Sequence, residues 1–131
     1  MEKGHKQFQS LILAFYKKNK RDFPWRNTTN PYNILISEIM LQQTQTYRVL
    51  PKYESWINRF PGFQQLAHAP FSEVLTYWSG LGYNRRALYL HQVAKEVMNV
   101  HKGKLPMDPK VLETFPGIGK NTAGSIYVFS T

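Results

Sequence analysis

The 131-residue sequence contains no cysteine, only eight acidic residues and no long hydrophobic run. Without cysteine, the chain holds no disulfide, no thiolate metal site and no iron–sulfur cluster of its own, and a reducing, intracellular setting fits. No apolar stretch approaches the roughly 18 residues that cross a bilayer, and residues 1–6 lack the apolar core of a secretory signal. We therefore expect an intracellular protein that contacts no membrane and binds no metal through this chain.

The acidic residues are outnumbered by 17 lysines and arginines, which gives a formal net charge of +9. An excess of this size favours a polyanionic partner, of which nucleic acid is the commonest. Two alternatives are a soluble protein that is merely basic and a basic helical adaptor for other proteins. Hydrophobic residues make up 42% of the chain, a fraction that indicates a globular domain rather than a disordered chain.

Proline and glycine divide the chain into short segments whose apolar residues recur at helical spacing. One such stripe runs from Phe8 to Phe15, and another lies within residues 85–101. No segment shows the alternating pattern of a strand beside a hairpin turn. We predict an all-α chain of seven or eight short helices that forms a single domain over residues 1–131. An N-terminal helix over 1–22 would pack beside a main helical barrel over 30–131.

One carboxylate, Glu38, lies inside an apolar stretch that runs from Tyr32 to Leu41. Its neighbours one helical turn away are Ile34, Leu35 and Leu41. A helix that is apolar all round is buried, and burial raises the pKa of a carboxyl. A carboxyl with a raised pKa can serve as a general acid near neutral pH. The alternative is a structural ion pair between Glu38 and an arginine, and the pattern alone does not separate the two.

Two turns carry side chains suited to contacting bases. The segment Leu41–Thr46 crowds amides and hydroxyls, including those of Gln43 and Thr44, at a helix end. Such groups can read base edges or fill an unstacked gap, but they are also ordinary polar residues of a helix terminus. The Gly-Leu-Gly-Tyr turn at 80–83 ends in Tyr83, which could wedge between bases or cover the edge of the core.

Two further segments are suited to binding phosphate. Arg85 and Arg86 open a helix, where the dipole disfavours cations, so a phosphate contact would explain them. The segment Phe115–Gly124 predicts a glycine hairpin followed by a new helix. The backbone N–H groups at the start of that helix form an anion site for a DNA phosphate, without sequence specificity. The hairpin residues expected to contribute are Gly117, Ile118, Gly119, Lys120 and Thr122.

Taken together, these motifs resemble the helix-hairpin-helix DNA glycosylases, most closely the MutY-type adenine DNA glycosylases. The likeness extends from about Phe8 to the end of the chain. It is most specific at Ser37–Gln45, while the hairpin is shared with endonuclease III and many relatives. It implies a helix-hairpin-helix glycosylase domain that is incomplete at its C-terminus, with the helix-hairpin-helix at about 108–131. The matching segments are Phe23–Arg26, Pro31–Tyr32, Ser37–Gln45, Gly80–Tyr83, Pro116–Gly119 and Thr122–Gly124.

The resemblance implies a monomeric base-excision repair enzyme that acts on double-stranded DNA with a mismatched or oxidised base pair. It would hydrolyse the N-glycosidic bond of adenine mispaired with 8-oxoguanine or guanine. Glu38 would protonate the purine ring of the flipped adenine and then help to position water. The base pocket would include Trp25, Arg26 and Asn121. The contacts around the opposite base would be Gln43, Thr44, Leu81 and Tyr83, with Tyr83 as the wedge.

The chain departs from the family pattern at two points. Asn121 stands where bifunctional endonuclease III relatives carry a nucleophilic lysine, so we expect monofunctional base excision. The alternative within the superfamily is a thymine- or uracil-mismatch glycosylase or an endonuclease III-like glycosylase, and asparagine at this position keeps the thymine-mismatch relatives open. The family's catalytic aspartate and four cluster cysteines lie beyond residue 131, so we expect the chain alone to be nearly inactive.

The same departures bear on cofactors. A 4Fe-4S cluster is expected only in a longer parent protein, through cysteines beyond residue 131, and the resemblance allows a monovalent cation at the hairpin. A non-catalytic DNA-binding fragment is the alternative from another class of function.

Overall fold

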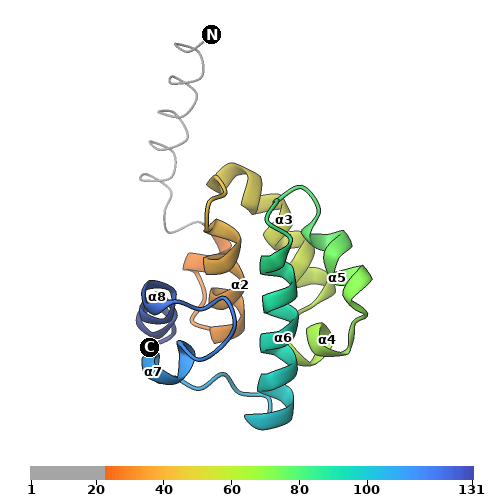
Figure 1. Ribbon diagram of the computed structural model, residues 1–131. Coiled ribbons are helices and arrows are strands. Elements are labelled where there is room, and N and C mark those ends of the chain that lie inside the picture. The colour runs from red at the N-terminus through yellow and green to blue at the C-terminus, as the bar shows by residue number, and fades with distance from the viewer. Residues whose placement is uncertain (1–22) are drawn as a thin grey trace.

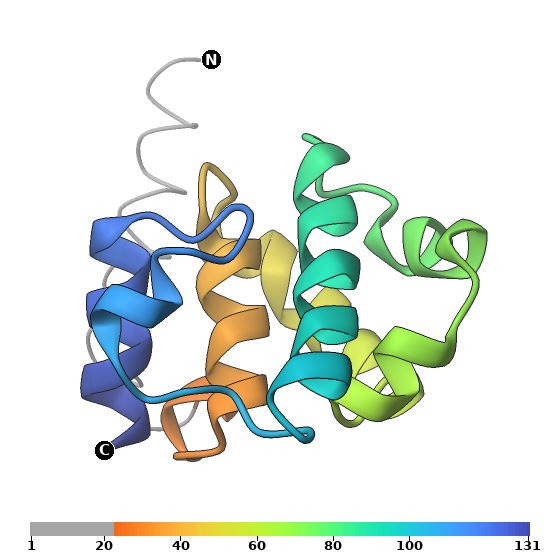
Figure 2. The same ribbon diagram turned by 60° about the horizontal axis from the view of Figure 1, so that its bottom comes forward.

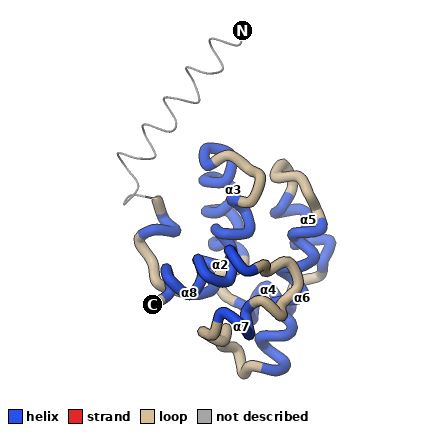
Figure 3. Tube along the Cα trace, turned by 60° about the vertical axis from the view of Figure 1, so that its left-hand side comes forward, coloured by secondary structure: helices blue, strands red, loops and turns tan. Residues whose placement is uncertain are grey.

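The computed structural model describes residues 23–131, and every regular element in that range is a helix (Figure 3). The predicted all-α class is confirmed, whereas the helix predicted over 1–22 lies outside the described residues. No helix within 23–131 is long and apolar enough to cross a membrane. The elements are the 3-10 helix η2 (Pro24–Arg26) and the α-helices α2 (Pro31–Leu41), α3 (Thr46–Arg59), α4 (Phe63–His68), α5 (Phe71–Trp78), α6 (Arg85–Val100), α7 (Pro109–Leu112) and α8 (Lys120–Ser130).

Helix α2 occupies the centre of the described domain. It lies between α8 and α6 in both ribbon views (Figure 1 and Figure 2) and also packs against α3. The longer helix α6 packs against α4 and α5, and α7 packs against α8. Seven of the eleven residues of α2 are buried. Neighbours on several sides therefore explain why its sequence is apolar nearly all round.

The first residue of α2 is fixed by a side-chain cap. Asn30 Oδ1 accepts hydrogen bonds from the backbone N–H of Tyr32 at 2.9 Å and of Asn33 at 3.4 Å. Pro31 occupies the first helical position, where its fixed φ suits the helix and its missing N–H costs nothing. Because the start is fixed, the face on which Glu38 lies two turns later is fixed as well.

The core between α2, α3 and α5 is aromatic and contains one buried polar network. The Trp56 ring packs edge-on against Trp78 at 5.8 Å and against Phe60 at 5.1 Å. The Tyr32 hydroxyl donates to the Phe60 carbonyl at 2.5 Å and accepts from Trp56 Nε1 at 3.1 Å. Burial raises the pKa of Tyr32 far above its ordinary value, so the hydroxyl keeps its proton. This network joins the start of α2 to the end of α3.

Tyr32→Phe is expected to destabilise the fold by about 1–3 kcal/mol, because it leaves a buried carbonyl and a buried indole N–H without partners. Urea unfolding followed by circular dichroism measures the change. Tyr127→Phe is the matched control, since Tyr127 is 41% exposed, and it should change stability by less than about 0.5 kcal/mol. Equal midpoints for Tyr32→Phe and the wild type would contradict the role of the network.

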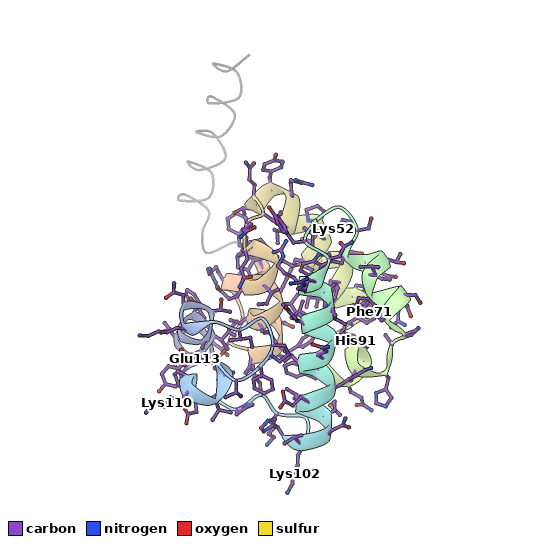
Figure 4. All side chains as sticks on the ribbon, viewed as in Figure 1. Lys52, Phe71, His91, Lys102, Lys110 and Glu113 are labelled. Atoms are coloured by element: carbon purple, nitrogen blue, oxygen red, sulfur yellow. The ribbon has the colours of Figure 1, made fainter. Side chains whose placement is uncertain are left out.

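A second buried polar contact joins α6 to the connection between α4 and α5. His91 of α6 lies beside Phe71 of α5 (Figure 4), with the two rings stacked at 5.8 Å. His91 Nε2 donates to the carbonyl oxygen of Ala69 at 2.9 Å. Burial lowers the pKa of His91, which favours the neutral ring. The contact orients α6, whose first turn lies beside the end of α2.

Candidate active site

Glu38 projects from α2 towards η2, and its side chain is only 17% exposed. Arg26 of η2 faces it, with 3.6 Å between Arg26 Nη1 and Glu38 Oε1. That distance is too long for a hydrogen bond, and neither of these two buried atoms has a hydrogen-bond partner. The arginine partner considered from the sequence is therefore present, but the pair is a loose electrostatic contact.

The two influences on the Glu38 carboxyl oppose each other. Burial raises its pKa, while attraction to the Arg26 guanidinium lowers it by a smaller amount. The net pKa lies above the ordinary value of 4.5, as the apolar pattern of α2 predicted. Since a neutral carboxyl carries a proton, Glu38 can act as a general acid at a higher pH than a solvated glutamate.

Arg26 is held between α2 and the C-terminal part of α8. Its guanidinium carbon lies 4.1 Å from the centre of the Phe129 ring, a cation–π contact. The preceding residue, Trp25, is completely buried and stacks on Phe23 at 5.1 Å. Of the residues predicted to form the base pocket, Trp25 packs against the rings of Phe23 and Tyr53, and Arg26 contacts the carboxyl. Asn121 is exposed in the first turn of α8.

The residues predicted around the opposite base are close together. Gln43, Leu81 and Tyr83 all line one open depression between the end of α2 and the start of α6. Thr44 approaches the same depression, with its hydroxyl 3.5 Å from the carbonyl oxygen of Leu81. Leu81 is buried at its base, whereas the Tyr83 side chain is 64% exposed. That exposure excludes the alternative in which Tyr83 covers the edge of the core.

Two residues at the rim of this depression have an unusual backbone conformation. Gln43 and Tyr83 have positive φ angles of 57° and 51°. The left-handed region costs a residue other than glycine about 1–2 kcal/mol, so the surrounding contacts must hold both residues in place. Neither residue is a glycine, so this conformation was not predicted at either position.

The hairpin between α7 and α8 depends on two glycines in different ways. Gly117 has a φ of 79°, and a Cβ atom there would lie 2.8 Å from the Tyr89 ring. Gly119 has an ordinary φ of −86° at the N-cap of α8 and meets nothing within 4 Å. No side chain caps α8, while Ile118 is buried and Lys120 is exposed. The hairpin therefore presents the uncapped start of a helix, the arrangement that favours an anion.

The predicted phosphate-binding side chains divide into two groups. Arg85 and Lys120 are exposed. Thr122 accepts a hydrogen bond from Gln42 Nε2 at 2.9 Å, which ties the start of α8 to the end of α2. The Arg86 guanidinium is turned inwards and donates to backbone carbonyls at the end of α2. The phosphate contact predicted for Arg86 therefore does not match its position.

Metal-binding residues are sparse in this structure. Within residues 23–131, no three histidine, aspartate or glutamate side chains are grouped to hold a metal ion. The residues of the chain do not fit an iron–sulfur cluster, because such clusters are held by cysteine thiolates and the sequence has none.

The packed helices, and the glycine hairpin that joins α7 to α8, define the class of helix-hairpin-helix folds. The sequence pattern of the HhH-GPD superfamily of base excision DNA repair proteins matches residues 36–127, and the chain belongs to this family. Every site residue predicted from the sequence, except Trp25 and Arg26, lies inside the matched segment.

Several curated relatives are adenine DNA glycosylases. That of Mycobacterium tuberculosis (strain H37Rv) is 41% identical over 120 residues, which are 91% of this chain and 40% of the relative. That of Mus musculus is 39% identical over 128 residues, covering 91% of this chain and 25% of the relative. That of Buchnera aphidicola subsp. Baizongia pistaciae is 39% identical over 122 residues, covering 93% and 35%. The chain thus spans a quarter to two fifths of the length of these three relatives.

Solved structures show the same fold. A thermostable thymine-DNA glycosylase superposes with a TM-score of 0.79 at 35% identity, over 98% of this chain and 60% of that one. Endonuclease III in a non-covalent complex with DNA superposes with a TM-score of 0.73 over 93% of this chain and 57% of that one. Its identity is 18%, so this second likeness concerns the fold alone.

Proposed function

We propose that this chain is the N-terminal catalytic part of a DNA glycosylase that hydrolyses the N-glycosidic bond of adenine mispaired with 8-oxoguanine or guanine. The observation that carries the proposal is the largely buried Glu38 carboxyl, whose pKa is raised although Arg26 lies 3.6 Å away. Adenine DNA glycosylases about 40% identical to this chain support the choice of base.

In the proposed reaction, neutral Glu38 donates its proton to a ring nitrogen of an adenine turned out of the duplex. When the bond between the sugar C1′ and adenine N9 breaks, the bonding electrons leave with the protonated base, which departs uncharged. The Glu38 carboxylate that remains is stabilised by Arg26. It can then orient the water that adds to C1′ and accept the proton that this water loses.

The loose geometry of the Glu38–Arg26 pair suits both stages of this reaction. At 3.6 Å the guanidinium lowers the pKa of Glu38 by less than burial raises it, so at a given pH more of the carboxyl is protonated than in a solvated glutamate. After proton transfer, the same positive charge lies close enough to stabilise the new carboxylate. A tight bidentate pair would lower the pKa of Glu38 and remove the acid.

Double-stranded DNA is the proposed partner. The exposed Arg85 and Lys120, with the backbone of Gly117–Gly119, would hold phosphates without regard to sequence. The exposed ring of Tyr83 would enter the base stack, next to the depression lined by Gln43. Bound monovalent cations at the hairpin would add to the phosphate contact. Such binding should weaken steeply as salt is raised.

A thymine- or uracil-mismatch glycosylase is the second candidate. The observation that favours it is the TM-score of 0.79 at 35% identity to a thermostable thymine-DNA glycosylase. The exposed Asn121 in the first turn of α8 is compatible with this second candidate.

Base release from defined duplexes tests the proposal. Duplexes with adenine opposite 8-oxoguanine, adenine opposite guanine, thymine opposite guanine and uracil opposite guanine are incubated with the chain and with the longest natural protein that contains it. Adenine release supports the proposal, and release of thymine or uracil alone selects the second candidate. Salt-dependent binding without base release by either protein would leave a DNA-binding fragment and overturn both.

Asn121 predicts that no covalent intermediate forms during base release, because a side-chain amide cannot form a Schiff base with the sugar. Sodium borohydride added during the reaction is expected to leave the protein free of cross-linked DNA on a denaturing gel. Endonuclease III, for which a trapped covalent intermediate with DNA has been solved, serves as the positive control. A cross-linked band with this protein would contradict a monofunctional reaction.

A further inference from the structure

Arg86 joins two turns that reach the same place from different helices. One turn, Gln42–Thr44, follows α2, and the other, Leu81–Tyr83, precedes α6. Arg86 Nη1 donates to the carbonyl oxygens of Ile39 at 2.6 Å and Gln42 at 2.5 Å. On the other side, Nη2 lies 3.2 Å from Thr44 Oγ1 and 3.4 Å from the carbonyl oxygens of Leu81 and Gly82.

The partial charges at the C-terminal end of α2 favour a guanidinium where that of Arg86 lies. The last carbonyl groups of a helix carry partial negative charge and lack partners within the helix. The guanidinium of Arg86 stays protonated and offers a planar fork of donors that several carbonyls can share. The positive charge of Arg86 is unfavourable at the start of its own helix α6. It is explained by the carbonyl groups at the end of α2, to which Arg86 donates. Its charge is used inside the protein instead of being exposed beside Arg85.

Two aromatic rings lie against the same guanidinium. The guanidinium carbon of Arg86 is 5.1 Å from the centre of the Trp78 ring and 5.5 Å from that of Tyr83. Trp78 is completely buried, and its Nε1 donates to the Gly82 carbonyl at 2.9 Å. The Arg86 guanidinium thus contacts both the buried Trp78 ring and the exposed Tyr83 ring.

The turns joined by Arg86 also contain the two left-handed residues at the rim of the depression, Gln43 and Tyr83. Neither residue has the conformational freedom of glycine, so each relaxes unless its neighbours hold it. Arg86 donates to the residues on both sides of Gln43, namely Gln42 and Thr44, and to Gly82 directly before Tyr83. Removing the guanidinium would release both turns together.

We propose that Arg86 is a positioning residue that sets the spacing between the Gln42–Thr44 and Leu81–Tyr83 turns, and with it the preference for the base opposite the excised one. Its role in base preference rests on the proposed function, while its hold on the turns rests on its own contacts. Arg86 acts without touching a phosphate, because the hydrogens of Nη1 and Nη2 are directed at protein oxygens.

Three variants test this proposal: Arg86→Met, Arg86→Lys and the matched control Arg85→Met. Methionine keeps an unbranched apolar stem without charge or donors, and lysine keeps the charge without the fork that spans both turns. Backbone order parameters from ¹⁵N relaxation at Gln43 and Tyr83 are expected to fall from about 0.85 to below about 0.6 in both Arg86 variants. They should stay unchanged in Arg85→Met. If Arg86→Met does not fold, Arg86→Lys gives the answer.

DNA binding by the same variants separates positioning from phosphate contact. In both Arg86 variants, the affinity ratio between a mispaired and a matched duplex should fall at least about tenfold, the loss expected for one specific contact. The salt dependence of binding should stay unchanged. Arg85→Met should instead reduce the slope of log K against log salt by about one and weaken both duplexes alike.

Two results would overturn the proposal. One is unchanged order parameters at Gln43 and Tyr83 in the Arg86 variants. The other is a reduced salt slope in those variants with an unchanged affinity ratio, which would make Arg86 a phosphate contact. If the wild type itself does not prefer mispaired DNA, while the turns loosen in both Arg86 variants, the proposed function fails and the hold of Arg86 on the turns stands.

Discussion

Glu38→Gln is expected to slow base release at least about 10²-fold, because an amide has no proton to give to the leaving base. Glutamine has nearly the shape of glutamate, so binding to a duplex with adenine opposite 8-oxoguanine should be preserved. Single-turnover base release, in the longest natural protein that contains the chain, measures the loss. Glu54→Gln is the control, since Glu54 is an exposed carboxylate of α3. An unchanged rate in Glu38→Gln would remove Glu38 from the chemistry.

The same substitution should change how stability depends on pH. The pKa of Glu38 is raised in the folded chain, so the folded state binds the proton more tightly than the unfolded state. The stability that this proton contributes is fully present below the ordinary pKa of 4.5, and it is lost as pH rises through the folded-state pKa. Glutamine cannot ionise, so Glu38→Gln loses none of it.

Melting temperatures measured from pH 4 to pH 8 check this sign. Glu38→Gln should gain stability relative to the wild type as pH rises. A constant difference between Glu38→Gln and the wild type at every pH would show that the Glu38 carboxyl does not titrate differently in the folded state. Higher stability combined with lost activity is the usual behaviour of a strained catalytic group.

Gly117→Ala is expected to destabilise the fold by about 2–5 kcal/mol. The left-handed φ of 79° costs an alanine about 1–2 kcal/mol. The new Cβ would lie 2.8 Å from the Tyr89 ring, and overpacking of this kind costs about 1–3 kcal/mol. Urea unfolding measures the sum. Adding Tyr89→Ala removes the ring atoms of this contact but leaves the Cβ of residue 89 at 3.0 Å and the backbone strain. The double variant should therefore carry a smaller penalty from residue 117, but not lose it.

Gly119→Ala is the control from the same hairpin. It should leave stability nearly unchanged and weaken DNA binding. Its φ of −86° suits alanine and its surroundings are open, so stability should change by less than about 0.5 kcal/mol. The added methyl group would stand where a phosphate approaches the start of α8, so DNA affinity should fall. Native affinity in Gly119→Ala would contradict DNA binding at the hairpin.

The helices were predictable because capping residues and the spacing of apolar residues, both local in sequence, determine where each helix lies. Asn30 and Pro31 mark the start of α2, and its apolar sequence indicates burial on nearly all sides. The raised pKa of Glu38 follows from the same pattern, since burial is its largest cause. The helical spacing of apolar residues likewise predicted a helix within residues 85–101, and α6 is found at Arg85–Val100.

The direction in which a side chain points was not predictable where its partners are distant in sequence. Arg86 donates to carbonyls 44 and 47 residues earlier, so the sequence showed an arginine in an unfavourable place without showing where its charge goes. Trp25 was expected to line a pocket and is completely buried. Only packing decides whether an aromatic residue in a proline-flanked turn faces outwards or inwards.

The left-handed residues Gln43 and Tyr83 and the turns around them already have their bent shape in the free protein. Their conformational entropy is therefore lost during folding and not during association with DNA. Under the proposed function, a duplex would meet two turns whose backbone is already bent before binding. We therefore expect the speed of recognition to depend on how quickly the protein scans along the duplex and how readily the mispair unstacks.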